Sequence, residues 1–175
     1  ISGMISKVKL NRVAHEVMSD LKLRPLNIDK TIGTLSGGNQ QKVIIGRWVA
    51  ADAQVFLFDE PTRGIDIGAK SEIYNLIEKL ARAGKAIVVV SSEMTEIIRI
   101  SDRVLVMYLG HAVELGTYDE VYHNPLHPYT KALMSAVPIP DPDQERNKVI
   151  QLLEGELPSP INPPSGCVFR TRCPI

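Results

Sequence analysis

The sequence predicts an α/β fold in which a parallel sheet is covered by helices. Strand-type and helix-type segments alternate between residues 36 and 108. Residues 55–58 (VFLF) and 86–90 (AIVVV) are short, continuous apolar runs, which are typical of strands buried on both faces. The chain of 175 residues is long enough for one ordinary domain with its own core. Its 20 basic and 20 acidic residues balance, so its charge gives no reason to expect nucleic acid as a partner.

Two helices are predicted before the first strand. Apolar residues keep a helical spacing over residues 5–20, which indicates an amphipathic helix. Arg24-Pro25 disfavours its continuation, and residues 26–35 have the composition of a loop. Ser36 then stands at the N-cap position of a second helix over residues 38–51.

The elements after the first strand follow from capping and turn residues. Asp66 can cap a helix that ends at Gly84, before the second strand. Residues 93–100 read as a short helix and residues 103–108 as a third strand. The turn pair Leu109-Gly110 then predicts a hairpin with residues 111–115.

The C-terminal part changes in composition. Residues 117–123 and 129–137 predict short helices. Eight of the 12 prolines fall in residues 138–175, so we expect an extended tail there rather than a core. Cys167 and Cys173 lie in this tail, and two thiols alone favour free cysteines of a cytosolic protein over a metal site.

The first residues that indicate chemistry are Asp59 and Glu60, directly after the strand VFLF. The carboxyl end of a parallel strand is where α/β folds bind ligands. Two adjacent carboxylates point in different directions, so one could serve Mg²⁺ while the other orients an attacking water, as phosphoryl transfer requires. The alternative is a solvated acidic turn.

A second candidate is the glycine-rich segment over residues 35–42 (LSGGNQQK). Gly37 and Gly38 allow the backbone to approach a ligand closely. The free amides of a helix N-terminus after Ser36 favour an anion. An ordinary glycine-rich helix cap explains the same residues.

The order of these motifs resembles ATP-binding-cassette (ABC) ATPases. LSGGN (35–39) looks like their signature loop, VFLFDE (55–60) like Walker B, and Ile65-Asp66 like the D-loop. The resemblance implies part of a P-loop NTPase fold that dimerises head to tail with a second ATP-binding domain. It also implies ATP and Mg²⁺ as cofactors.

The resemblance implies a role for each matching residue. Glu60 would be the general base, and Asp59 would hold Mg²⁺ through water. Asp66 would lie at the dimer interface and contribute to nucleotide binding. The signature residues would contact the nucleotide of the partner domain: Ser36, Gly37, Gly38, Asn39 and Gln40.

Two features depart from the family pattern. No G-x-x-x-x-G-K-[ST] occurs in the 175 residues, so we expect a fragment that is inactive alone. Ser92 stands where the family has its switch histidine, ten residues before Asp102. Serine cannot donate a charged hydrogen bond, and a helix cap before residues 93–100 explains Ser92 equally well.

The resemblance changes type along the chain. Residues 1–100 resemble the second ATP-binding domain of ribose- and galactose-type sugar importers. Residues from about 101 to 175 resemble the C-terminal region of oligopeptide and dipeptide importer ATPases. We therefore expect a chimera with a junction near Ser101, and either sugar or oligopeptide as the solute.

The predicted organisation is the C-terminal half of a nucleotide-binding domain over residues 1–137, followed by the tail, residues 138–175. Within it we expect a helical subdomain (1–53), a Walker B, D-loop and switch region (54–116), and two C-terminal helices (117–137). The predicted function is an ATP-hydrolysing importer subunit on the cytoplasmic face of the membrane, with transmembrane permease subunits as partners and a solute-binding protein as an indirect one. The alternatives are a non-catalytic, signature-donating or regulatory half-domain, or a truncated chimera without activity.

Overall fold

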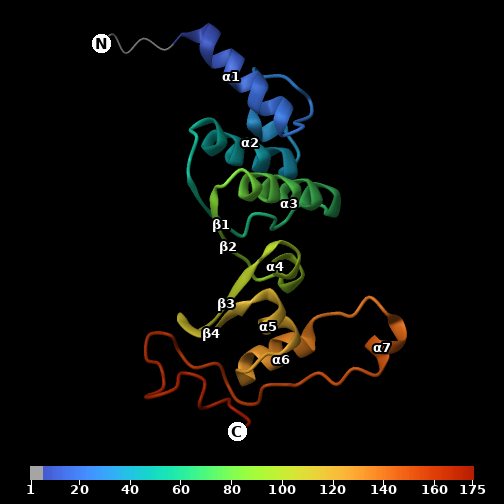
Figure 1. Ribbon diagram of the computed structural model, residues 1–175, viewed down its shortest axis with the longest axis vertical. Coiled ribbons are helices and arrows are strands. Elements are labelled where there is room, and N and C mark those ends of the chain that lie inside the picture. Colours follow the sequence, from blue (N-terminus) through green and yellow to red (C-terminus); the bar gives the residue numbers. More distant parts are fainter. Residues whose placement is uncertain (1–5) are drawn as a thin grey trace. The chain divides into compact units, whose positions relative to one another are not determined.

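The computed structural model describes residues 6–175, in which residues up to Ser92 form one compact unit and Glu93–Ile175 form a second (Figure 1). Ile5, the predicted first residue of the first helix, lies outside the described residues. None of the helices in residues 6–175 is both long enough and apolar enough to cross a membrane.

Over its described residues, 6–92, the first unit contains four helical segments and two strands. They are α1 (Lys7–Asp20), the 3-10 turn η1 (Ile32–Thr34), α2 (Gly37–Ala50), β1 (Val55–Asp59), α3 (Ile67–Arg82) and β2 (Ala86–Val90). The predicted helices and strands are confirmed to within two residues at each described end, and η1 is an addition inside the predicted loop.

Strands β1 and β2 pair in parallel, from Val55 opposite Ala86 to Asp59 opposite Val90. Phe56 and Phe58 of β1 are buried, and their rings stack with centroids 5.7 Å apart. Helix α3 contributes its apolar stripe to the same core: Ile73, Tyr74, Ile77 and Leu80. The predicted parallel pairing is therefore confirmed.

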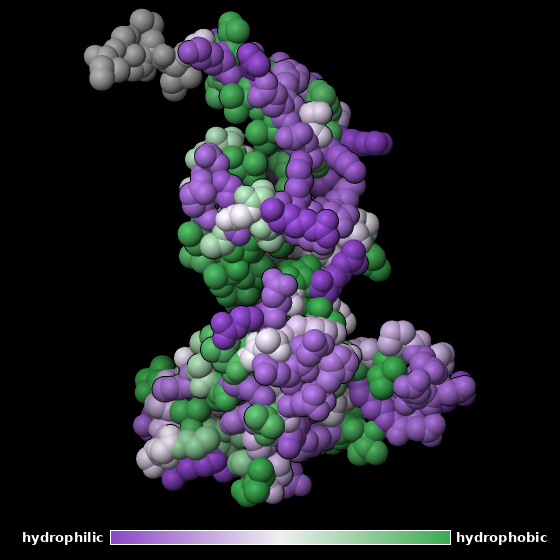
Figure 2. All heavy atoms as spheres, in the orientation of Figure 1, coloured by the Kyte–Doolittle hydropathy of each residue, from purple (hydrophilic) through white to green (hydrophobic). Residues whose placement is uncertain are grey.

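The opposite face of this strand pair is exposed. Leu57 is 76% exposed, and Val55, Val88 and Val90 are also exposed. Figure 2 shows apolar residues gathered over the region where Figure 1 labels β1 and β2. The prediction that both faces are buried is wrong for the described chain, because α3 and its neighbours cover one face.

The second unit is built on a hairpin. Its elements are α4 (Met94–Ile100), β3 (Arg103–Tyr108), β4 (His111–Thr117), α5 (Tyr118–His123), α6 (Pro128–Ala136) and α7 (Pro142–Arg146). Leu109 and Gly110 both have positive φ, 48° and 78°, which suits the tight turn between paired strands.

The hairpin corrects one prediction. Strand β3 pairs antiparallel with β4 in a separate two-stranded sheet, so within residues 6–175 it does not extend the parallel pair. The alternation of strands and helices indicates the strands but not which of them pair, because pairing depends on contacts between distant segments.

The proline-rich tail is also more integrated than predicted. It contains α7, and Phe169 near its end is completely buried. The Phe169 ring lies 5.1 Å from that of Tyr108 in β3 and 5.5 Å from that of Tyr129 in α6. The tail therefore supplies a core side chain, because these aromatic rings have an apolar surface that Phe169 covers.

Candidate functional site

The predicted catalytic residues meet at the carboxyl ends of β1 and β2. Glu60 follows the last residue of β1, with φ at 46°, a left-handed conformation that is uncommon outside glycine. Its amide donates to the carbonyl of Val90 at 2.8 Å, which extends the strand pairing by one residue. Its carboxylate Oε1 accepts from the amide of Ser92 at 2.9 Å. Glu60 and Ser92 therefore lie side by side, and Asp59 is exposed beside them at the strand end.

The structure tests one of the two interpretations of Ser92, that of a helix cap. The N-cap of α4 is Glu93, so the prediction that Ser92 caps this helix is wrong. Ser92 instead contacts the carboxylate that the resemblance assigns as general base, through its backbone amide rather than its hydroxyl. A backbone contact of this kind does not depend on which side chain stands at position 92.

The glycine-rich turn forms its own hydrogen-bond network. Ser36 is the N-cap of α2, but its hydroxyl does not cap the helix and instead accepts from Asn39 Nδ2 at 2.9 Å. Asn39 Oδ1 in turn accepts from the amide of Arg24 at 3.3 Å. Gln40 Nε2 donates to the carbonyl of Leu35 at 2.8 Å. These contacts hold the turn from both sides of Ser36.

The same turn lies against the start of α3. A Cβ atom on Gly37 would contact Ile65 Cγ2 at 3.4 Å, and one on Gly38 would overlap the Cβ of Ala69. Asp66 caps α3, as predicted, by accepting from the amide of Ala69 at 2.9 Å. The structure therefore brings the signature-type glycines next to the D-loop-type residues. It arranges the predicted site residues in two groups, this one and the group at the strand ends.

Sequence reasoning missed two residues that support the glycine-rich turn. Lys42 of α2 is only 4% exposed, and its Nζ forms an ion pair with Glu72 Oε2 of α3. One signal was present in the sequence: Lys42 lies four residues after Gly38, so both face the same side of a helix. Its burial could not be inferred, because lysine is almost never buried without a partner.

Asp59 suits the magnesium role that the resemblance implies. Mg²⁺ in nucleotide sites is bound by one or two carboxylates together with phosphate oxygens and water, rather than by a full set of protein ligands. An exposed carboxylate at a strand end meets that requirement. Within residues 6–175 there is no group of three or more His, Cys, Asp or Glu side chains placed to hold a metal ion.

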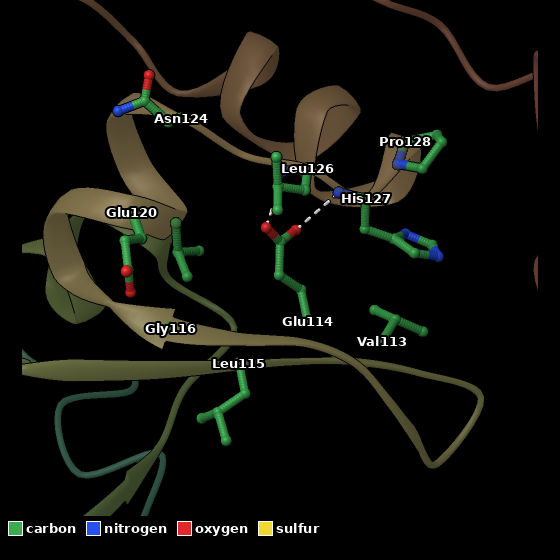
Figure 3. A pocket seen from close by; sticks show the side chains of 10 residues that line it. Val113, Glu114, Leu115, Gly116, Glu120, Asn124, Leu126, His127 and Pro128 are labelled. Atoms are coloured by element: carbon green, nitrogen blue, oxygen red, sulfur yellow. Dashed lines mark hydrogen bonds between the residues drawn. The ribbon is translucent and has the colours of Figure 1, made fainter.

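A separate pocket of about 630 Å³ lies in the second unit, between β4 and helices α5 and α6 (Figure 3). Glu114 stands within it, and its two carboxylate oxygens accept from the amides of Leu126 at 2.8 Å and His127 at 3.0 Å. Burial raises the pKa of Glu114, but these hydrogen bonds and the nearby His127 outweigh that effect and hold the pKa below its ordinary value. Both carboxylate oxygens are thus engaged in joining β4 to the segment before α6.

Comparison with known protein families matches two parts of the chain. Residues 4–63 match the ABC transporter family, and residues 113–175 match the C-terminal region of oligopeptide/dipeptide transporters. The first match contains the glycine-rich turn together with Asp59 and Glu60. The second contains Glu114, most of the pocket and the tail.

Curated relatives match the chain across both parts. The oligopeptide transport ATP-binding protein OppF of Salmonella typhimurium is 58% identical over 160 residues, which cover 91% of this chain and 48% of that protein. OppF of Escherichia coli is 54% identical over 172 residues, covering 98% of this chain and 52% of that protein. The chain thus spans about half the length of these relatives.

These relatives correct the sugar-importer interpretation of residues 1–100. Proteins of one oligopeptide-importer type match more than nine-tenths of the chain without a break in type near Ser101. Neither the sugar resemblance nor the predicted chimera is supported.

A solved structure agrees with the fold. MJ1267, an ATP-binding cassette of an ABC transporter in its ADP conformation, superposes with a TM-score of 0.61 at 24% identity, over 71% of this chain and 50% of that one. The chain therefore has the α/β fold of the ABC ATPases, and over more than nine-tenths of its length its sequence is similar to the ATP-binding proteins of oligopeptide transport.

Proposed function

We propose that this chain is the part of an oligopeptide importer's ATP-hydrolysing subunit that carries the signature turn and the catalytic carboxylate. The observation that carries the proposal is the hydrogen bond from the Ser92 amide to Glu60, which holds one carboxylate at the carboxyl ends of two parallel strands. Ligands of α/β folds bind at this edge. The similarity to OppF proteins supports oligopeptides as the solute.

The proposed roles follow from where the side chains lie. Glu60 orients and deprotonates the attacking water, since its carboxylate is held in place by Ser92. Asp59 holds Mg²⁺ through water, and this ion would neutralise developing charge on the phosphate oxygens. Asp66 and the turn at Ser36 contact the nucleotide of a second ATP-binding domain.

We propose that the whole subunit works as a dimer of ATP-binding domains docked on membrane permease subunits at the cytoplasmic face. The alternating closure and opening of the dimer would drive oligopeptide uptake. A solute-binding protein would act only indirectly, by delivering the peptide to the permease.

A second candidate is a non-catalytic role as donor of the signature turn to a partner's ATP site. One observation favours it: the turn is held in place by its own hydrogen bonds, from Asn39 to Ser36 and from Arg24 to Asn39. Isothermal titration of the chain with MgATP tests the donor role. No heat of binding is the expected result, and micromolar affinity would contradict it by showing an ATP site within these residues.

Both candidates share a test of the signature turn. The chain is mixed with an intact OppF-type subunit, and the ATPase rate is compared for the wild type, Ser36→Arg and Ser19→Arg. We expect the wild type and Ser19→Arg to raise the rate of the mixture, because Ser19 is exposed on α1 and is not part of the turn. Ser36→Arg should abolish the increase, since a bulky cation would occupy the space for the phosphate. Equal rates with all three proteins would contradict the proposal.

A further inference from the structure

Helix α2 packs against α3 and the residues just before it through three pairs of residues. These pairs occur in the same order along both segments. Gly37 lies against Ile65, Gly38 against Ala69, and Lys42 pairs with Glu72. Residues 38 and 42 are one turn apart on α2, and residues 69 and 72 are about one turn apart on α3. The N-terminal turns of the two helices therefore lie side by side. We call the set Gly38, Lys42, Ala69 and Glu72 the α2–α3 contact.

The contact at Gly38 requires the absence of a side chain. A Cβ atom there would overlap the Cβ of Ala69, and the helix backbone could not move away without breaking its packing. Gly38 thus has a packing role in addition to any contact between its amide and a phosphate. Ala69 is also the residue whose amide Asp66 caps, so Asp66 and the glycine-rich turn are joined through a single residue.

Lys42 closes the other end of the contact. The Lys42 side chain is only 4% exposed, whereas that of Glu72 is 49% exposed, so the lysine is the more deeply buried member of the ion pair. A buried ammonium group costs free energy unless it is paired, and the pair with Glu72 stabilises one relative position of α2 and α3. Sliding of either helix would separate the two charges and leave Lys42 buried without this carboxylate.

We propose that Lys42 is a positioning residue that holds the turn at Ser36–Gly38 and the D-loop-type residue Asp66 as one rigid piece. Lys42 acts through these residues, and its paired carboxylate, Glu72, fixes the register of the two helices. The functional consequence rests on the proposed function: both groups would be presented to a partner's nucleotide together, so neither could engage alone.

The test is hydrogen–deuterium exchange of the full chain without nucleotide. In Lys42→Met, which keeps the length and apolar character of the side chain, we expect exchange to rise roughly tenfold at both residues 37–41 and residues 65–70. Lys42→Arg should retain protection at both segments, because it keeps the charge. Lys79→Met, an exposed lysine on the same α3, should resemble the wild type.

Two results would overturn the proposal. A rise confined to residues 37–41 would show that the two segments are not joined, and an equal rise throughout β1 and β2 would show only a loss of stability. If Lys42→Met does not fold, Glu72→Gln tests the proposal instead. The Glu72 side chain is half-exposed, so this variant should fold, and its exchange should rise at the same two segments. No change in Glu72→Gln would also contradict the proposal.

A second test, at Gly38, does not depend on charge. Gly38→Ala should raise exchange at both segments, and adding Ala69→Gly should restore protection by removing the overlapping Cβ. Failure of Ala69→Gly to restore protection would count against the side-by-side arrangement. Because these measurements need neither ATP nor a partner, the rigid piece can be confirmed even if the mixed ATPase assay rejects the proposed function.

Discussion

At the scale of single residues, two glutamates show how a carboxylate can be held by backbone amides. Glu60 accepts from the amide of Ser92 at the strand ends, and Glu114 accepts from the amides of Leu126 and His127 in the second unit. Glu60 could be predicted as a catalytic candidate, because two carboxylates directly after an apolar strand can be recognised in the local sequence. Glu114 gives no such signal, since the amides that it binds come from a later loop.

The hydrogen bonds to the Glu114 carboxylate predict that the stability of the fold depends on pH. The pKa of this carboxyl in the folded chain lies below the ordinary 4.5, so its contribution is present above the ordinary pKa and is lost as the pH falls through the folded pKa. We expect the wild type to lose thermal stability between about pH 5 and pH 3 more steeply than Glu114→Gln. Melting curves by circular dichroism across this range measure the difference.

The control for this prediction is Glu156→Gln, an exposed glutamate of the tail that should follow the wild type. Parallel curves for the wild type and Glu114→Gln would show that the hydrogen bonds from Leu126 and His127 do not favour the ionised carboxyl.

At the scale of elements, the boundaries were predictable and the pairings only partly so. The helix α3 could be read from Asp66 at its N-cap, a repeated apolar stripe and Gly84 after its end, all of which are local signals. The hairpin of β3 with β4 was likewise predicted from Leu109-Gly110 and is confirmed. The separation of this hairpin from the β1–β2 pair and the burial of Lys42 could not be predicted, because both depend on residues that packing alone brings close. The glycine-rich turn was found from its sequence, but its contact with Ala69 required the structure.

The exposed face of β1 and β2 predicts a surface that binds apolar probes. Leu57 and Val88 are opposite each other in the register and both are exposed. In Leu57→Thr/Val88→Thr we expect less binding of a fluorescent apolar dye and less light scattering. The free energy of unfolding should change by less than about 0.5 kcal/mol for each substitution, because both side chains are exposed and threonine, which is β-branched, suits strands.

The matched control is Phe56→Ala on the buried face of the same strand. It should cost about 3 kcal/mol in urea unfolding, since it leaves a cavity beside Phe58. If Leu57→Thr were as costly as Phe56→Ala, the face would be covered rather than exposed.

At the scale of the whole molecule, composition described the tail incorrectly. Twelve prolines, most of them late in the chain, indicate extended backbone, and much of residues 147–168 is indeed without helix or strand. Composition cannot show that one aromatic residue returns to the core. The partners of Phe169 lie far away in sequence, so no periodic pattern connects them.

The buried ring predicts that the tail stabilises the second unit. Phe169→Ala should lower the free energy of unfolding by about 3 kcal/mol and make residues 147–168 more sensitive to limited proteolysis. Ile161→Ala, at a side chain that is 94% exposed, should change neither measurement by a resolvable amount. Unchanged proteolysis in Phe169→Ala would mean that other contacts, such as that of Arg172 with the carbonyl of Leu153, hold the tail alone.

The same ring limits how this protein can be engineered. The exposed positions around Ile161 suit the insertion of a label or of foreign sequence. A shortened version that stops before Phe169 would instead uncover the rings of Tyr108 and Tyr129 and invite aggregation. Expression trials that trim the tail as dispensable should therefore cut only beyond residue 172.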